Sequence, residues 1–428
     1  MAAPLALIAA LAAGSSTAAA EGPFAIGFSE TLLGGPDGGR WALRTRAAGA
    51  DAVRISFYWS VVATERPAQP RNPTDPAYDF GPIDRAVTSA HREGLDILMT
   101  VVGAPPWAEG PVRPPVSRQA PAGTWRPDPE AFGDFAHAVA VRYAGTFPDP
   151  ARPGFVLGEV DLYSAWNEPN TTAFLTPQYR DGENVSAAIY TRLLNAFGAE
   201  VRAVNPDARI ATGGTAPSGD PVGERRTPPL EFWRAVLCLT PELERAESCP
   251  ADEPARFDLL AHHPISSLAP PNVHAERPGD VTAADFGRLG ELLGAAEREG
   301  TIEPAAGHAL LAPEIWWETS PPQPSAVSLR RQARYMQLAL FLLWRQGAEG
   351  AWFLQVRDSP RERGSHGWAA TRPGSTPTAA ARSPPCARSA FRSSAPGPPP
   401  ARFAFGAGRR PPGGCGCRCA AAAKAGGR

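Results

Sequence analysis

The stretch VDLYSAWNEPN, residues 160–170, ends an apolar run on an amide and an acid, Asn167 and Glu168, and then places Pro169 in the next turn. Proline cannot donate a ladder hydrogen bond and fixes its own φ, so the strand has to end here. Polar, reactive side chains at a strand end are typical of the C-terminal rim of a parallel barrel, where enzymes of that architecture place their active sites. The stretch therefore predicts a strand that ends at a functional rim.

Apolar runs of the same kind recur along the chain, separated by longer amphipathic segments. With 160–166, the predicted strands are 24–29, 52–58, 95–102, 208–214, 257–263, 309–317 and 350–358. Helical periodicity and stops at Gly or Asn-Pro predict helices that include 82–94, 128–145, 187–206 and 328–347. Eight strands alternating with helices predict a (β/α)8 TIM barrel, forming a single catalytic domain over residues 21–360.

A doubly wound open sheet also alternates strands with helices. No glycine-rich phosphate-binding turn follows the run at 24–29, however, and the candidate functional residues fall at the ends of several different strands. The barrel is therefore the favoured fold.

Composition and the N-terminus bear on location and partners. The 428 residues carry a formal net charge of -1, which gives no indication of nucleic acid as a partner. Residues 1–20, MAAPLALIAALAAGSSTAAA, combine an apolar stretch with an Ala-x-Ala ending and predict a secretory signal peptide, although the usual charged start is missing. A membrane anchor is the alternative, but the apolar stretch is short for a span. We expect a secreted, extracellular protein without stable membrane insertion.

Two cysteines, Cys238 and Cys249, lie in the well-patterned part of the chain, separated by LTPELERAES. This separation suits a loop disulfide in an oxidising compartment, in agreement with export. The alternative is a pair of free thiols.

Two carboxylates fall at strand ends. Glu168 ends the fourth predicted strand and Glu314 follows the apolar core of the seventh. In a barrel these strands lie on opposite sides of the mouth, so the two carboxyl groups can face each other. Cleavage of a glycosidic bond needs such a pair: one acid protonates the leaving oxygen, and the other carboxylate attacks or activates water. Asn167 would donate to or accept from a sugar 2-hydroxyl.

These residues resemble the retaining glycoside hydrolases of clan A, with family 39 and cellulase-like family 5 as the nearest likeness. The resemblance rests on WNEPN after the fourth strand, a glutamate on the seventh, AVRISFYW on the second and WFLQVRD on the eighth, and covers about residues 24–358. It implies that Glu168 is the acid/base, with Asn167 beside it, and that Glu314 is the nucleophile. It also implies that Arg54 keeps the nucleophile carboxylate ionised and that the reaction needs no cofactor.

Two departures from the clan pattern weaken parts of this assignment. Pro313 stands where the clan commonly has threonine, so Glu318 and Glu303 remain alternative nucleophiles. Ile265 interrupts the His-Pro-Tyr-like sequence expected after the sixth strand, so His263 is either a rim residue that binds substrate or a structural histidine. No cluster of histidine and carboxylate residues has metal-ligand spacing.

Several tryptophans fall at or just past predicted strand ends. Indole rings stack on the apolar faces of sugars, so tryptophans at one rim would favour a carbohydrate substrate. Core packing is the alternative for each of them. The candidates are Trp107, Trp317 and Trp352, together with Trp59 and Trp166.

The C-terminal part, residues 361–428, changes character: from 363 onward it contains no Leu, Ile, Val, Asp, Glu or Asn. A disordered low-complexity tail is one interpretation, and CGCRC at 415–419 is a weak metal-site signal. We favour a slipped reading frame, because shifting the codons of 374–394 by one base permits a segment that resembles the close of a clan A barrel. The chain would then lack its last helix, leaving the first and eighth strands partly uncovered.

The predicted function is hydrolysis of O-glycosidic bonds in an oligosaccharide, polysaccharide or glycoside by retaining double displacement. A barrel that binds glycans without cleaving them, or a decayed enzyme, is the alternative. The sequence carries no signal for an oligomeric state.

Overall fold

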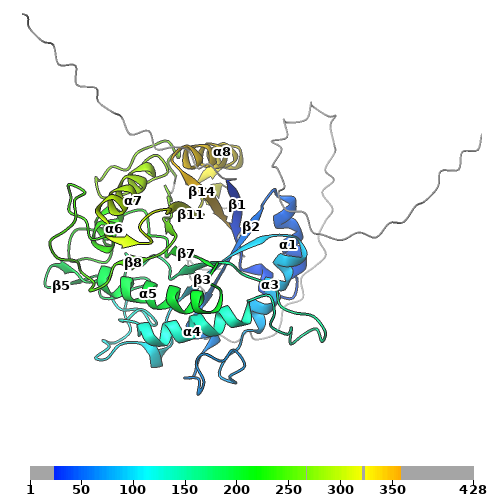
Figure 1. Ribbon diagram of the computed structural model, residues 1–428. Helices are drawn as coiled ribbons and strands as arrows, with labels where there is room; N and C mark the ends of the chain where they lie inside the picture. Colours follow the sequence, from blue (N-terminus) through cyan, green and yellow to red (C-terminus); the bar gives the residue numbers. More distant parts are fainter. Residues whose placement is uncertain (1–23, 267, 321–322, 358–428) are drawn as a thin grey trace, which may run out of the picture. The chain divides into compact units, whose positions relative to one another are not determined.

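The computed structural model describes residues 24–266, 268–320 and 323–357, and these contain a closed barrel of eight parallel strands (Figure 1). The predicted (β/α)8 fold is confirmed. The predicted signal peptide at 1–20 and the tail at 361–428 lie outside the described residues. In order around the barrel, the strands are β1 (Ala25–Ser29), β2 (Ala52–Tyr58), β3 (Asp96–Val102), β4 (Leu162–Ala165), β7 (Arg209–Thr212), β9 (Leu259–Ala261), β11 (Ala309–Ile315) and β14 (Ala348–Leu354).

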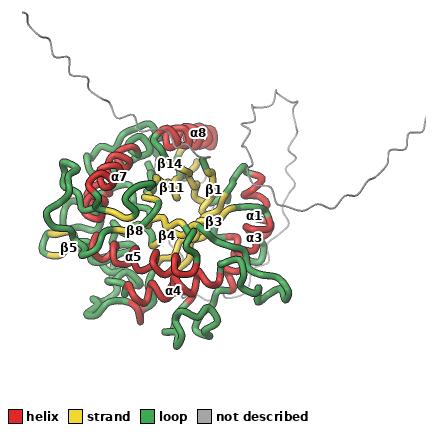
Figure 2. The backbone as a smooth tube through the Cα atoms, in the orientation of Figure 1, coloured by secondary structure: helices red, strands yellow, loops and turns green. Residues whose placement is uncertain are grey.

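Helices surround the strands (Figure 2), and the four predicted ones correspond to α3, α4, α5 and α8. Their ends follow ordinary capping rules: the Asp128 side chain accepts from the Glu130 and Ala131 amides at the start of α4, and α7 ends at Gly300 in the left-handed conformation. The helices are α1 (Gly38–Ala47), α2 (Trp59–Val62), α3 (Gly81–Arg92), α4 (Pro129–Arg142), α5 (Ser186–Val204), α6 (Pro229–Val236), α7 (Gly287–Glu299) and α8 (Leu329–Arg345), with 3-10 turns η1 (Leu32–Gly34) and η2 (Pro106–Ala108). Three small sheets pair β5 (Tyr179–Arg180) with β6 (Glu183–Asn184), β8 (Ala255–Arg256) with β10 (Ile302–Glu303), and β12 (Thr319–Ser320) with β13 (Val327–Ser328).

The barrel has two apolar layers. Between strands and helices lies the larger layer, which includes Phe132, Tyr163 and Phe197. The barrel interior is filled mainly by small and aliphatic side chains and one indole: Ala52, Leu98, Ala211, Leu259, Ala261, Leu311 and Trp352. This packed interior forces a ligand to bind at the mouth rather than pass through the barrel.

Cys238 and Cys249, in the segment after α6, are joined by a disulfide with a Cα–Cα distance of 5.1 Å. Within the described ranges, every helix is too short or too polar to cross a membrane.

The face over β1 and β14 is apolar. Phe28 of β1 lies beside Phe353 of β14, with ring centroids 6.0 Å apart. Helix α8, which precedes β14 in the sequence, has two exposed aromatic side chains, Phe341 and Trp344. The segment expected to follow β14 falls outside the described residues.

Candidate active site

The segment after β4 leaves the extended conformation abruptly. Trp166 and Glu168 both have positive φ, 76° and 40°, and this is why the predicted strand at 160–166 ends at Ala165. Non-glycine residues in this region are strained and cluster at functional sites. The Glu168 amide donates to the Gly214 carbonyl at 2.9 Å, which holds the turn against the segment after β7.

Gly213 and Asn170 hold this turn against the segment after β7. A Cβ on Gly213 would lie 2.8 Å from the Ala165 carbonyl oxygen, so only glycine permits this close approach. The buried Asn170 side chain donates to the carbonyls of Ala216 at 3.2 Å and Thr227 at 3.0 Å, and accepts from the Ala216 amide. The backbone that carries Glu168 is therefore rigidly placed.

Glu314 lies near the end of β11, where the strand is irregular. Between Ala312 and Ile315, β11 has one residue more than its partner β14. Pro313, which has no amide hydrogen to donate, falls in this irregular part. Such bulges re-aim side chains next to active sites, and Glu314 lies within this one with its side chain in contact with Arg54.

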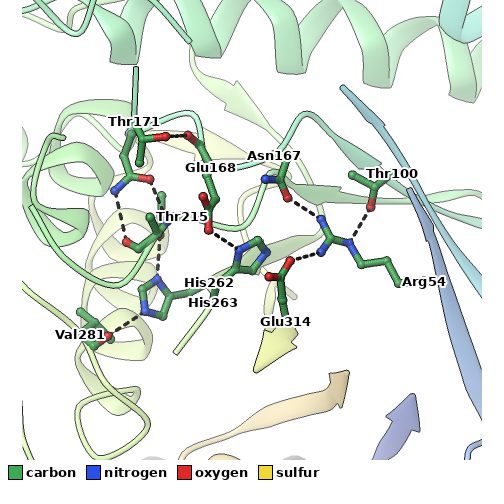
Figure 3. A network of polar contacts seen from close by, with 12 residues as sticks. Arg54, Thr100, Asn167, Glu168, Thr171, Thr215, His262, His263, Val281 and Glu314 are labelled. Atoms are coloured by element: carbon green, nitrogen blue, oxygen red, sulfur yellow. Dashed lines mark hydrogen bonds and ion pairs between the residues drawn. The ribbon is translucent and has the colours of Figure 1, made fainter. Parts of the chain in front are cut away.

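Arg54 of β2 joins the two strand ends (Figure 3). Its Nη1 donates to Glu314 Oε2 at 2.9 Å, its Nη2 to Asn167 Oδ1 at 2.6 Å and its Nε to Thr100 Oγ1 at 3.0 Å. The Arg54 side chain is only 2% exposed, so the ion pair with Glu314 is largely shielded from water. Asn167 uses its oxygen on Arg54 and keeps its Nδ2 as a donor.

Glu168 contacts a histidine instead of an arginine. His263 Nδ1 lies 3.0 Å from Glu168 Oε1, and the His263 side chain is completely buried. Burial lowers the pKa of His263 to about 3, so its ring is neutral at neutral pH. His263 Nε2 has no partner among the described residues, and the ring packs against Gly214. In this structure, His263 thus contacts the acid and is closed to solvent.

The neighbouring His262 is a structural residue. Its Nδ1 is 2.8 Å from Thr215 Oγ1 and its Nε2 is 3.1 Å from the Val281 carbonyl, so both ring nitrogens are satisfied within the fold.

The two carboxyl groups have opposite environments. Burial raises the pKa of Glu168 to about 7, and the charges of Arg54 and Arg226 oppose this rise only in part. Glu314, by contrast, has the Arg54 guanidinium in direct contact. Figure 3 shows both side chains directed toward the space around His263 and Arg54. A carboxylic acid beside an ion-paired carboxylate can perform paired acid and nucleophile chemistry.

The alternative nucleophiles lie elsewhere. Glu303 belongs to β10, before β11, is 53% exposed and forms a salt bridge with Arg256 at 2.8 Å. Glu318 lies past the end of β11, where its backbone carbonyl accepts from Val327. Of the three glutamates, Glu314 is the one that contacts Arg54.

A cavity of about 740 Å³ opens beside Glu168. It is bounded by the segments that follow β4, β7, β9 and β11. Its lining includes Thr171, Thr172, Ser218, Arg225, Arg226, Ile265, Ser266, His274, Arg277 and Trp316.

The predicted tryptophans are mostly packed. Trp352 is 2% exposed inside the barrel, against Gly27. Trp317 is 3% exposed and donates to the Ala269 carbonyl at 3.0 Å. Trp107 is half-buried; its Nε1 donates to the Ala63 carbonyl at 3.0 Å. This placement fits the packing alternative for Trp317 and Trp352, and it is Trp316 that lines the cavity.

Sequence reasoning missed Thr100 and Trp316. Thr100 lies on β3 two residues past Leu98, the register partner of Arg54, so strand alternation was the signal that could have found it. Trp316 follows the irregular part of β11, where alternation no longer tells which of two adjacent tryptophans faces the mouth.

Within the described ranges, no group of three or more His, Cys, Asp or Glu side chains could hold a metal ion.

No protein-family model matches the sequence, and no curated protein matches it either. Solved structures do match. A family 39 glycoside hydrolase from the gut symbiont Bacteroides cellulosilyticus WH2 has a TM-score of 0.50 and 19% identity, over 79% of this chain and 58% of that one. A monomeric beta-xylosidase from Caulobacter crescentus CB15 (TM-score 0.46, 17% identity, 78% and 61%) and an endo-beta-1,4-mannanase from Thermotoga petrophila (0.44, 12%, 80% and 71%) also match.

The strand order defines the class of fold, an eight-stranded (β/α)8 barrel, and a family 39 glycoside hydrolase is among its structural neighbours. The chain spans less than two thirds of the length of the first of these neighbours.

Proposed function

We propose that this chain is a glycosidase that cleaves O-glycosidic bonds by retaining double displacement, with Glu168 as acid/base and Glu314 as nucleophile. The observation that carries the proposal is the contrast between these two carboxyl groups at one rim: Glu314 is ion-paired with Arg54, whereas burial raises the pKa of Glu168 to about 7. The family 39 neighbour supports the barrel as a scaffold for this chemistry.

In the first step, a Glu314 oxygen attacks the anomeric carbon and forms an ester bond to the sugar. The glycosidic C–O bond breaks, and Glu168 gives its proton to the departing oxygen. In the second step, Glu168 takes a proton from water, the water oxygen attacks the anomeric carbon, and the ester bond to Glu314 breaks. Configuration at the anomeric carbon is retained, and both carboxyl groups return to their starting states.

The neighbouring groups support each step. Arg54 holds Glu314 in place through one of its three hydrogen bonds, and the Asn167 Nδ2 donor is free for the sugar 2-hydroxyl, where hydrogen bonds strengthen in the transition state. After Glu168 has lost its proton, His263 can donate from Nδ1 to the resulting carboxylate. Of the tryptophans predicted to bind substrate, Trp317 and Trp352 are buried and Trp107 is partly exposed. Trp107 therefore remains the candidate for stacking on a sugar ring.

We further propose that the protein is secreted and acts on a carbohydrate outside the cell. The signal-like residues 1–20 and the disulfide between Cys238 and Cys249 support export, since disulfides persist in oxidising compartments.

The proposal is tested with a panel of aryl glycosides and the variants Glu168→Gln, Glu314→Gln and Glu303→Gln. We expect hydrolysis by the parent and by Glu303→Gln, loss of turnover by on the order of 10⁴-fold in Glu314→Gln, and NMR detection of a first product with retained configuration. An inverted product would contradict double displacement. Sugar binding without turnover in a folded parent would instead support a non-catalytic barrel.

A further inference from the structure

A second cavity, of about 660 Å³, is lined by Arg40, Trp41, Arg44, Val356 and Arg357. We call the three arginines with Trp41 the Trp41 patch. The guanidinium carbons of Arg44, Arg357 and Arg40 lie 4.8, 5.2 and 5.9 Å from the centroid of the Trp41 ring. Trp41 itself is 7% exposed, so the arginines form the accessible part of the patch.

Among the described residues, no carboxylate is paired with the three positive charges of the Trp41 patch. None of the residues that line this cavity is acidic, and none of the three arginines forms a salt bridge with a described carboxylate. The nearby Glu30 carboxylate is 2% exposed and already accepts from the amides of Leu32 and Val356. Arg46, on the same helix, is different: it pairs with Asp51 at 3.3 Å.

Stability alone gives a weak reason for this arrangement. Arg40 and Arg44 are one turn apart on α1, and like charges at this spacing repel each other. Each cation–π contact at an exposed site is weakly favourable and covers the Trp41 ring, but covering the ring does not require three cations. An anion held between the guanidinium groups would remove the repulsion and use their planar donors in bidentate hydrogen bonds.

The patch lies at the rim that carries the candidate active site. Arg40 and Trp41 are in the first turn of α1, which follows the C-terminal end of β1, and Val356 and Arg357 follow the C-terminal end of β14. The hydrogen bond from the Val356 amide to Glu30 Oε2 at 3.1 Å ties these two strand ends together. Glu168 and Glu314 stand at the C-terminal ends of β4 and β11, so a long ligand could contact both sites.

We propose that the Trp41 patch binds an anionic polysaccharide through sulfate or carboxylate groups and holds it beside the barrel mouth. The choice of a glycan over other anions rests on the proposed function and on the formal net charge of -1, which does not favour nucleic acid.

The test measures binding of the full chain to dextran sulfate and to uncharged dextran by affinity electrophoresis. The variants are Arg44→Gln, the double change Arg40→Gln with Arg44→Gln, and Arg46→Gln as the matched control on the same helix. We expect retardation by dextran sulfate and not by dextran, with affinity about fivefold weaker in Arg44→Gln and at least twentyfold weaker in the double variant. Arg46→Gln should stay within about twofold of the parent, since it removes the same charge outside the cavity.

Equal weakening by Arg44→Gln and Arg46→Gln would overturn the proposal, because the attraction would then depend on net charge alone. Tighter binding to single-stranded DNA than to dextran sulfate would contradict the choice of a glycan. Polygalacturonate in a parallel assay distinguishes carboxylate from sulfate recognition, and retardation by either polymer supports the patch. Gln keeps helix propensity near that of Arg, and circular dichroism checks that each variant is folded.

Binding is measured without turnover, in the parent and in Glu168→Gln, so the result is separate from the proposed function. Patch-dependent binding by a chain that hydrolyses no glycoside would leave this proposal standing and overturn the glycosidase. Hydrolysis of a glycoside without patch-dependent binding would support the glycosidase and overturn the proposal for the Trp41 patch.

Discussion

Arg54 and Glu314 form an ion pair with an N–O distance of 2.9 Å, although 260 residues separate them in the sequence. Arg54 also donates to Asn167 and Thr100, so one guanidinium orients the nucleophile candidate and the residue beside the acid candidate. This fork is the feature of the site that a lysine cannot reproduce.

Arg54→Lys should therefore lower kcat/KM for a glycoside by about 10²–10³-fold while keeping the charge. Steady-state kinetics give the effect. Arg46→Lys, at the exposed pair with Asp51, is the matched control and should change activity less than twofold. Near-parent activity in Arg54→Lys would contradict this expectation, because it would show that a positive charge supports catalysis without the three hydrogen bonds of the guanidinium.

The acid candidate predicts a pH limit. Glu168 must be protonated to serve the leaving group, and burial raises its pKa to about 7, so kcat/KM should fall as the pH rises through about 7. In Glu168→Gln this basic limb should disappear, and activity on substrates with poor leaving groups should fall far more than on activated aryl glycosides. An unchanged basic limb in Glu168→Gln would mean that another group supplies the proton.

The same raised pKa affects stability. Between the ordinary value of 4.5 and about 7, the folded chain keeps the Glu168 proton and the unfolded chain loses it. The contribution of Glu168 to the free energy of unfolding is therefore fully present below pH 4.5 and is lost as the pH rises to 7. The loss is at most about 3 kcal/mol. Denaturant titrations at pH 5 and 8 should show a smaller difference for Glu168→Gln than for the parent; an equal difference would argue against the shift.

His263 supplies a test of positioning. An added Cβ at Gly214 would overlap the His263 ring, so Gly214→Ala should displace the ring and its contact with Glu168. We expect kcat to fall at least tenfold, with a shifted basic limb in the pH profile, an effect that simple destabilisation would not produce. Gly294→Ala on α7, where the nearest atom to a new Cβ is 3.5 Å away, should keep activity and raise stability by about 0.5–1 kcal/mol.

The sequence predicted the strands well because each is a short apolar run bounded by polar residues. The strand predicted at 52–58 coincides with β2. The predicted strand at 160–166 was too long at both ends, and at its C-terminal end Trp166 adopts a positive φ, a property of the turn that the residue type does not reveal. Glu168 and Glu314 could be proposed from their places at strand ends.

Contacts between distant segments were harder to foresee. The pairing of His263 with Glu168 depends on how the ring packs against Gly214, and no local pattern contains that information. The tryptophans illustrate the same point, since a place near a strand end does not tell whether an indole faces the mouth or the packed interior. Both tryptophans follow the irregular part of β11, and Trp316 lines the cavity whereas Trp317 is buried.

Covalent trapping tests the central assignment most directly. The folded chain is incubated with a panel of 2-deoxy-2-fluoro glycosyl fluorides, and the labelled peptide is mapped by mass spectrometry, with Glu314→Gln as the control. The proposed mechanism predicts a glycosyl ester on Glu314, absent from the control, and the sugar that reacts identifies the substrate class. A label on Glu318 or Glu303, or no label on a chain that hydrolyses a matching glycoside, would contradict Glu314 as the nucleophile.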